Sequence, residues 1–394
     1  MSTLSRRIFR SCLLAPAIAL AAVAVGAPGV PAASAGTSSC LCFHAVYTDL
    51  AGAVHDSAYD TVKKTWSDQI APGSVPAASD PYAVKTADNR YHIVYIDLTG
   101  RLHDDFEDPA TMKWTDLVPP GSVKADTNST PVVVDFAEPK GGYTQHIIYV
   151  GADHRLHNNQ FDPKANSWFD QIPPGSVPVG NTVFKAPSAV DEGGGYFRIV
   201  YQGNDLHLHQ ARFDANATPK TWTDTIVPMS VLANNGLTRV GFATDPTPSF
   251  HIVYLGLDGF VHNDREDLGT STWYDQIPPG SIKAAANSIP TFTLGNDGHP
   301  HVLYFGSDGF VHNDNYDPVT KTWFDQIPPG STFTEASPNG STTYNNTFPV
   351  VYSDGTHIHV DVFNPSTGTW SDTIPTGSAK GIFGRAPAVA NTDI

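Results

Sequence analysis

The sequence predicts an all-β protein, a β-propeller of seven blades with four antiparallel strands in each blade. Two observations lead to this prediction. All seven tryptophans recur 47 to 54 residues apart, which is typical of a repeat architecture. Each repeat contains short segments typical of strands, and no segment shows a sustained helical period. The tryptophans are Trp66, Trp114, Trp168, Trp222, Trp273, Trp323 and Trp370.

Other residue types keep the same register. A tyrosine opens every copy, a histidine follows it, and an aspartate stands two residues after every tryptophan. A residue that every blade needs is most simply a packing residue, so we interpret these positions as scaffold first. The tyrosines are Tyr47, Tyr95, Tyr149, Tyr201, Tyr254, Tyr304 and Tyr352.

The fifth repeat illustrates the expected strands. Its first segment is β-branched and aromatic, which favours a strand. Leu257-Asp258-Gly259 predicts a hairpin turn, because Asp-Gly readily supplies positive φ. Proline ends the outer strand, since it cannot donate to the ladder. In chain order the segments are 251–255, 260–262 and 273–277, and residues 290–294 form the innermost strand of the next blade.

The two ends of the repeat array predict how the ring closes. Residues 43–47 match the second strand of a blade, whereas residues 385–389 resemble the first-strand segment 185–190. We therefore expect the C-terminal strand to complete the first blade beside the N-terminal strands, which removes exposed edges. No linker interrupts the repeats, so residues 36–394 are expected to form a single propeller domain.

Residues 1–35 predict a signal peptide. A basic start at 5–10, an apolar run at 12–25 and small residues at 33–35 fit this assignment. The Arg6-Arg7 pair resembles a twin-arginine signal, and a general secretory signal is the open alternative. The run is too short and alanine-rich for a membrane span. We expect a secreted, extracellular protein without membrane insertion.

The charge of the chain bears on its partners. Residues 1–35 carry three arginines and no acid, so their removal shifts the net charge from -16 to -19. Nucleic acids and anionic membranes require basic patches, so we expect neither as a partner. Cys40 and Cys42 lie too close together to join distant parts of the fold, and whether they form a disulfide is left open.

One further histidine, ahead of each tyrosine, breaks the uniform pattern. Five copies keep it, but the fourth has Arg198 and the seventh Pro349. The same five copies carry polar residues after their second histidine. A position kept in five blades and lost in two predicts a repeated ligand site. The predicted ligand-binding residues are His44, His92, His146, His251, His301, His55, His103, His157, His262, His312, Asn158, Asn263 and Asn313.

The geometry of each histidine pair depends on the loop between them. An even-numbered loop would place His251 and His262 on one face of the sheet, and an odd-numbered loop on opposite faces. On a shared face, imidazoles, an amide and a nearby aromatic ring would suit a neutral sugar between blades. A solvated or merely packed histidine is the alternative, and the sequence leaves both open.

Motifs for catalysis and cofactors are missing. There is no His-Glu-x-x-His zinc motif, no G-x-S-x-G and no phosphate-binding loop. A glycosidase needs a carboxyl pair, and no acid confined to one blade stands out. We therefore expect no catalytic residues, no metal and no cofactor.

The repeats resemble blades of seven-bladed propeller lectins of the Photorhabdus type, and more distantly the six-bladed fungal fucose-binding lectins. The shared features are Tyr304, Asp308-Gly309, His312, Asp317 and Trp323 and their counterparts, over essentially the whole chain after residue 35. The resemblance implies glycan binding at several equivalent sites between blades. The Arg and Glu that grip the sugar in the fungal family have no visible counterpart, so fucose itself is not implied.

We therefore expect a secreted, multivalent carbohydrate-binding protein whose partners are glycans, fucosylated or otherwise neutral. The residues favour a binding protein over an enzyme. One alternative is a polysaccharide lyase or glycosidase acting on a propeller face, with acids of one blade near the axis. The other alternative is a protein-interaction propeller, which should expose an apolar patch.

Overall fold

The computed structural model describes residues 42–180, 185–243, 248–295, 299–317, 319–333, 338–340, 348–364, 366–381 and 385–391. The predicted signal peptide and Cys40 lie outside the described residues, so secretion and a Cys40–Cys42 disulfide stay predictions. No helix among the described residues is long and apolar enough to span a membrane.

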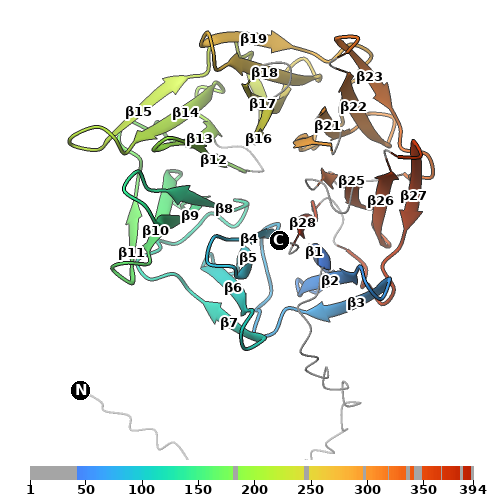
Figure 1. Ribbon diagram of the computed structural model, residues 1–394, viewed down its shortest axis with the longest axis horizontal. Coiled ribbons are helices and arrows are strands. Elements are labelled where there is room, and N and C mark those ends of the chain that lie inside the picture. Colours follow the sequence, from blue (N-terminus) through green and yellow to red (C-terminus); the bar gives the residue numbers. More distant parts are fainter. Residues whose placement is uncertain are drawn as a thin grey trace, which may run out of the picture. The chain divides into compact units, whose positions relative to one another are not determined.

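Seven four-stranded antiparallel sheets surround a central axis, which confirms the seven-bladed β-propeller (Figure 1). We number the sheets as blades 1 to 7, each written from its inner to its outer strand. Blade 1 is β28 (Ala388–Asn391), β1 (Cys42–Thr48), β2 (Val54–Asp60) and β3 (Thr65–Ile70); blade 2 is β4 (Tyr82–Lys85), β5 (Tyr91–Ile96), β6 (Leu102–Asp108) and β7 (Lys113–Leu117); blade 3 is β8 (Val132–Ala137), β9 (Tyr143–Val150), β10 (Leu156–Asp162) and β11 (Ser167–Gln171); blade 4 is β12 (Ser188–Gly193), β13 (Tyr196–Gln202), β14 (Leu208–Asp214) and β15 (Thr221–Ile226); blade 5 is β16 (Ala233–Ala243), β17 (Ser249–Gly256), β18 (Val261–Asp267) and β19 (Thr272–Gln276); blade 6 is β20 (Thr291–Leu294), β21 (Pro300–Phe305), β22 (Val311–Asp317) and β23 (Thr322–Gln326); blade 7 is β24 (Asn339–Gly340), β25 (Phe348–Ser353), β26 (Ile358–Asn364) and β27 (Thr369–Thr373).

The C-terminal strand closes the ring. β28 pairs antiparallel with β1, with Phe43 opposite Asn391 and Val46 opposite Ala388. Blade 1 is therefore built from both ends of the chain, as the sequence predicts. Figure 1 shows β28 at the inner edge of blade 1, where it covers the edge that β1 would otherwise expose.

Burial explains why the second strand of each blade is so apolar. β5, β17 and β21 are buried along their whole length, because both faces of these strands pack against neighbouring blades. The outer strands alternate instead: β19 places Trp273 inward and leaves Thr272 and Tyr274 exposed. The tryptophan therefore anchors the outer strand to the core.

Seven tyrosines tie the blades together. Each phenol oxygen accepts a backbone N–H bond from the loop that closes the preceding blade, at 2.8 to 3.1 Å. A buried N–H that lacks a partner costs roughly 1–3 kcal/mol, so each tie contributes to blade spacing. The donors are Val75, Val123, Val177, Val231, Ile282, Thr332 and Ala379.

Candidate functional site

The loop between the two histidines of a blade settles their orientation. In blade 5, His251 pairs with Arg265 and Tyr254 pairs with His262 across β17 and β18. Residues 256–260 form an odd-numbered connection. Because His251 and Tyr254 are three positions apart on one strand, His251 and His262 lie on opposite faces of the sheet. The two predicted histidines of a blade therefore do not form one site.

The second histidine of each blade packs on the face toward the preceding blade. His262 stacks on Tyr254 with ring centroids 5.4 Å apart, and its Nδ1 lies 2.8 Å from Asp275. Its Nε2 lies 3.2 Å from Asp258, so both ring nitrogens have protein partners. His55, His103, His157 and His312 repeat the stack on tyrosine and the bond to aspartate. This geometry suits a scaffold, and a ligand role for these five histidines stays a prediction.

The first histidine of each blade faces the next blade. It is buried in all five copies, and its Nδ1 lies 2.8 to 2.9 Å from an oxygen of Asp56, Asp104, Asn158, Asn263 or Asn313. An aromatic ring of the next blade covers the imidazole in four of these interfaces. The pairs are His44–Tyr91, His146–Phe197, His251–Phe292 and His301–Phe348, with centroids 4.3 to 4.7 Å apart. The structure thus brings each first histidine together with the predicted Asn, or with an Asp in its place.

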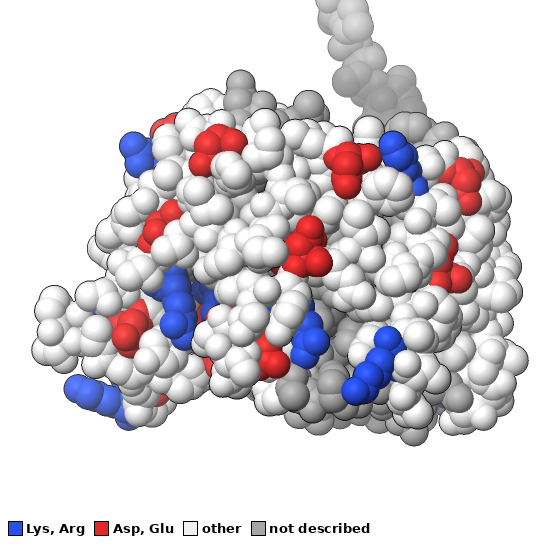
Figure 2. Space-filling model, turned by 90° about the horizontal axis from the view of Figure 1, so that it is seen from above, with Lys and Arg blue, Asp and Glu red and all other residues white. Residues whose placement is uncertain are grey.

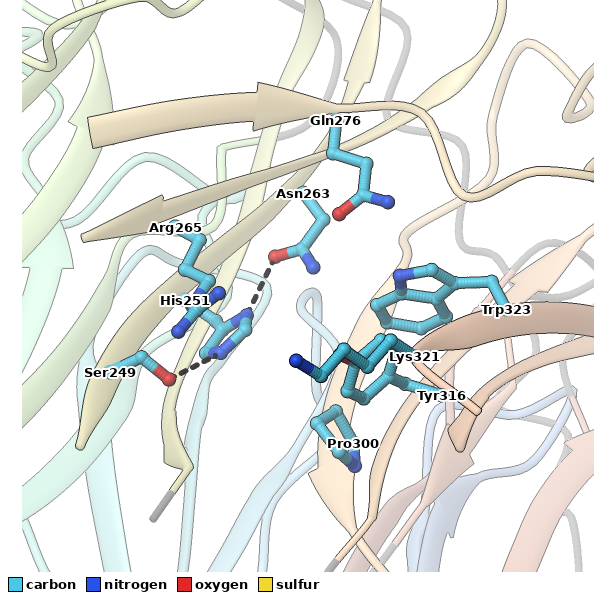
Figure 3. A pocket seen from close by; sticks show the side chains of 9 residues that line it. All are labelled: Ser249, His251, Asn263, Arg265, Gln276, Pro300, Tyr316, Lys321 and Trp323. Carbon is cyan, nitrogen blue, oxygen red and sulfur yellow. Dashed lines mark hydrogen bonds between the residues drawn. The ribbon is translucent and has the colours of Figure 1, made fainter. Parts of the chain in front are cut away.

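One of these interfaces contains a pocket. It lies between blades 5 and 6 and has a volume of about 150 Å³ (Figure 3). Blade 5 contributes two of the predicted residues, His251 and Asn263, and blade 6 contributes an aromatic wall. The lining residues are Ser249, His251, Asn263, Arg265, Gln276, Pro300, Tyr316, Lys321 and Trp323.

Hydrogen bonds fix the histidine at the base of this pocket. Ser249 Oγ donates to Nε2 at 2.9 Å, and Nδ1 donates to Asn263 Oδ1 at 2.9 Å. Burial lowers the pKa of His251 to about 4, although the bond to Asn263 opposes this shift. The imidazole is therefore neutral near pH 7. Because Asn263 Oδ1 is occupied, its NH₂ group is the part that can serve a ligand.

A proline explains why the pocket opens here. Pro300 precedes the first histidine of blade 6, and in five other blades this position holds a buried aromatic ring that faces the preceding blade. A proline side chain fills less space than any of these rings. The five rings are Phe43, Tyr91, Phe197, Phe250 and Phe348.

Arg198 shows how an interface without the histidine is filled. Its guanidinium lies 4.3 Å from the centroid of the Phe250 ring and forms a 2.8 Å ion pair with Glu266 of blade 5. Arg198 also pairs with Glu192 of its own blade. The departure at the fourth copy is thus compensated by a buried cation with acidic partners.

A second pocket of about 170 Å³ lies among the inner strands near the axis, where Tyr82 and Arg239 line it. Asp80 has its pKa raised to about 6 by burial, and the charges of Arg385 and Arg239 oppose this shift. None of the described lining residues is acidic, so they supply no carboxyl pair of the kind that glycosidases use.

Two groups of three side chains have the types and spacing to hold a metal ion. They are Asp354, His357 and His359, and His103, Asp105 and Asp116, with ligand atoms within 4.8 Å of one another. In both groups the histidine and an aspartate belong to the hydrogen-bonded set that every blade repeats. His357 in the first group and Asp105 in the second add a ligand beyond that set, and three ligands are the minimum for a catalytic zinc site.

Sequence reasoning missed several residues of the pocket, among them Arg265, Gln276 and Lys321. Arg265 lies beside His251, on the face of the sheet opposite to His262. The signal was available as a departure from the repeat. Pro300 stands where most blades place an aromatic residue.

No protein-family model and no curated protein sequence matches the chain. Solved structures do. The SapL1 lectin in complex with alpha-methyl fucoside is 15% identical with a TM-score of 0.52, and the alignment covers 78% of this chain and 97% of that lectin. The fucose-specific lectin from Aleuria aurantia is 18% identical with a TM-score of 0.50, over 76% and 96% of the two chains.

A proposed 6-phosphogluconolactonase from Bacteroides uniformis is also similar, with 13% identity and a TM-score of 0.58. That alignment covers 88% of this chain and 98% of the other. Likeness at such low identity establishes the fold alone, and this fold is shared by lectins and by a protein assigned to an enzyme class. The function must therefore be argued from the site.

Proposed function

We propose that the chain is a carbohydrate-binding protein whose principal site is the pocket between blades 5 and 6. The observation that carries this proposal is the composition of the two walls. One wall offers planar hydrogen-bonding groups, Arg265, Asn263 and Gln276, and the other offers the rings of Trp323 and Tyr316. Figure 3 shows these groups facing one another across the pocket.

This combination matches the chemistry of a sugar ring. Sugar hydroxyls both donate and accept hydrogen bonds, and amides and a guanidinium meet them in defined directions. The C–H face of a pyranose is apolar and packs on aromatic rings. Ligand pockets for drug-sized molecules are roughly 300–1,000 Å³, so a pocket of about 150 Å³ suits one sugar unit.

The histidine contributes indirectly in this proposal. His251 has both ring nitrogens bonded to protein groups, so it orients Asn263 toward the ligand and does not itself contact it. His44, His92, His146 and His301 would act in the same way wherever their interfaces admit a sugar. We propose these interfaces as weaker sites, because at three of them an aromatic ring at the position of Pro300 packs against the histidine. His251 is covered instead by Phe292 of the inner strand β20, which does not line the pocket.

Gln276→Ala tests the site with a matched control. Gln276 is exposed and pairs with Asn263, as Gln171 pairs with Asn158 in blade 3, so Gln171→Ala makes the same change at another interface. We expect Gln276→Ala to weaken sugar binding about fivefold to tenfold, the effect of one lost hydrogen bond, and to leave unfolding unchanged. The measurement is isothermal titration of the sugars that bind on a broad glycan array.

The control decides how many sites operate. If Gln171→Ala leaves the affinity and a stoichiometry near one unchanged, the pocket of blades 5 and 6 dominates. Equal losses in both variants, with a stoichiometry near five, would instead support the equivalent sites that the repeats predict. A wild-type protein that binds no glycan on the array contradicts the proposal.

We also propose that residues 1–35 direct the protein out of the cytoplasm. The basic start, the apolar run and the small residues before position 36 support this proposal. N-terminal sequencing of the protein from culture medium should find a start near residue 36. Retention of the full-length chain inside cells would contradict it, and an Arg6→Lys/Arg7→Lys variant separates the twin-arginine route from the general one.

A further inference from the structure

The pocket between blades 5 and 6 has a distinctive charge. Arg265 reaches it from β18 of blade 5, and Lys321 reaches it from the turn before β23 of blade 6. Figure 3 shows both cationic groups extending toward His251. None of the described residues that line the pocket is acidic, although the chain carries a net charge of -16.

The other interfaces provide a comparison within the same molecule. The position of Arg265 is Ala58, Phe106, Gln160, Arg212, Asn315 or Val362 in the other blades, as the strand registers define it. The residue two before the facing tryptophan is Met112, Asn166, Lys220, Ser271, Gly368 or Lys64 at the corresponding interfaces. Only the interface of blades 5 and 6 places a cation at both positions.

Two of the three single cations at the other interfaces have acidic partners. Arg212 forms a 2.7 Å ion pair with Glu192, and Lys220 forms a 3.1 Å ion pair with Glu138. Within the described part of the chain, no carboxylate lies within ion-pair distance of Lys321. Its turn is held by Asp317, which accepts backbone bonds from Val319 and Thr320. Lys321 is thus presented from a fixed turn with its charge available.

We propose that the ligand of this pocket is an acidic saccharide, a sugar that carries a carboxylate or a sulfate. An anionic group would lie between the Arg265 guanidinium and the Lys321 ammonium. The planar guanidinium meets a carboxylate or sulfate through two parallel N–H bonds, whereas the ammonium acts as a point charge. This inference rests on the proposed carbohydrate site and specifies the class of sugar that enters it.

The described surface that Figure 2 shows outside the pocket lacks the concentrated positive charge that the pocket has. On the face in Figure 2, acidic and basic side chains are scattered singly among uncharged residues, without a basic patch. A protein with excess negative charge repels acidic polysaccharides at long range. The pocket would therefore select them at short range, where Arg265 and Lys321 face one another and none of the described lining residues is acidic.

The test compares matched acidic and neutral sugars. Titrations of wild type with glucuronate and glucose, galacturonate and galactose, and galactose 6-sulfate should show tighter binding of each acidic sugar by about tenfold or more. Comparing the carboxylated sugars with the sulfated sugar shows which of the two anionic groups the pocket binds. Acidic-sugar affinity should also fall as salt rises, because ion pairs are screened.

Lys321→Gln should weaken acidic-sugar binding about fivefold, the upper range for an exposed ion pair, and weaken neutral-sugar binding by a smaller factor. Lys64→Gln is the matched control, since Lys64 holds the same position opposite Val362 rather than an arginine. Arg265→Gln provides a second variant with a larger expected loss.

The outcomes separate this inference from the proposed function. Neutral sugars that bind as tightly as acidic ones, together with an unaffected Lys321→Gln variant, would overturn the acidic-ligand inference and leave the carbohydrate site standing. A protein that binds neither class would overturn both. An equal loss in Lys64→Gln and Lys321→Gln would show a general charge effect and would also overturn it.

Discussion

Among single residues, the most unusual are four buried aspartates, each two residues after the second histidine of its blade. Burial, together with the charge of the neighbouring Asp275, raises the pKa of Asp264 to about 9. Asp105 and Asp361 behave alike, with pKa values raised to about 9, and that of Asp314 is raised to about 8. Each of these carboxyls therefore holds a proton near neutral pH.

The sign of the pH dependence follows from the direction of these shifts. A raised pKa in the folded state means that the folded protein keeps a proton that the unfolded chain releases above about pH 4. Stability is therefore fully present below the unfolded pKa and is lost as pH rises through the folded pKa values of about 8 to 9.

Asp264→Asn should reduce the loss of folding stability that occurs as pH rises. Asn159 occupies the same position in blade 3, so the interface accepts an amide there. We expect the variant to be more stable than wild type by about 1–2 kcal/mol at pH 8, the scale of one to two units of pKa shift, and equal to it near pH 4. The reciprocal change Asn159→Asp should steepen the pH dependence. Urea unfolding from pH 4 to 9 measures both, and parallel curves for all three proteins would contradict the account.

The pocket residues show where reasoning from repeats succeeds and where it fails. His251 and Asn263 could be predicted because the repeat keeps their positions in several blades. Arg265, Gln276 and Lys321 could not be predicted, because each contributes to a site only together with residues of the neighbouring blade. The sequence alone does not show which side chains of two blades face one another. The site also depends on a departure from the pattern, Pro300, rather than on a repeated residue.

At the level of elements, the strand order and the hairpin turns follow from the sequence, but the pairing of the two histidines does not. The turn at Asp258-Gly259 was predictable, and Gly259 has the expected positive φ of 84°. Whether the connection counts an even or an odd number of residues depends on where the ladder ends, at Leu255 and Val261. That detail decides the faces of His251 and His262, because a strand alternates with period two.

Pro300→Phe tests the account of the open interface. Five blades carry a buried aromatic ring at this position, so β21 can accept one in the same backbone. We expect the ring to fill the pocket and reduce sugar affinity by about tenfold or more, with unfolding within about 1 kcal/mol of wild type. Sugar titration and thermal unfolding measure the two quantities. If this variant is as stable as wild type and still binds sugar as wild type does, the proposed location is contradicted.

For the whole molecule, the ring depends on a strand contributed by the far end of the chain. Because β28 supplies the inner edge of blade 1, the first and last repeats fold as one cooperative unit rather than as a stack with free ends. This closure was predictable from two short patterns, residues 43–47 and 385–389.

Deleting residues 386–394 should open the ring. β1 would then expose an unpaired edge, and we expect the unfolding midpoint to fall by about 10 °C or more, with an increased tendency to aggregate. Deleting only residues 392–394, which lie beyond β28, is the control and should leave the midpoint within about 2 °C. Calorimetry and light scattering measure both effects, and equal midpoints for the two truncations would contradict the closure.

The most direct test of the central claim is a crystal of the protein soaked in a mixture of neutral and acidic monosaccharides. We predict density for one sugar ring between blades 5 and 6, with its polar edge at Arg265, Asn263 and Gln276 and its C–H face against Trp323. Density only in the pocket at the axis near Tyr82 and Arg239, or none at any interface, would contradict it.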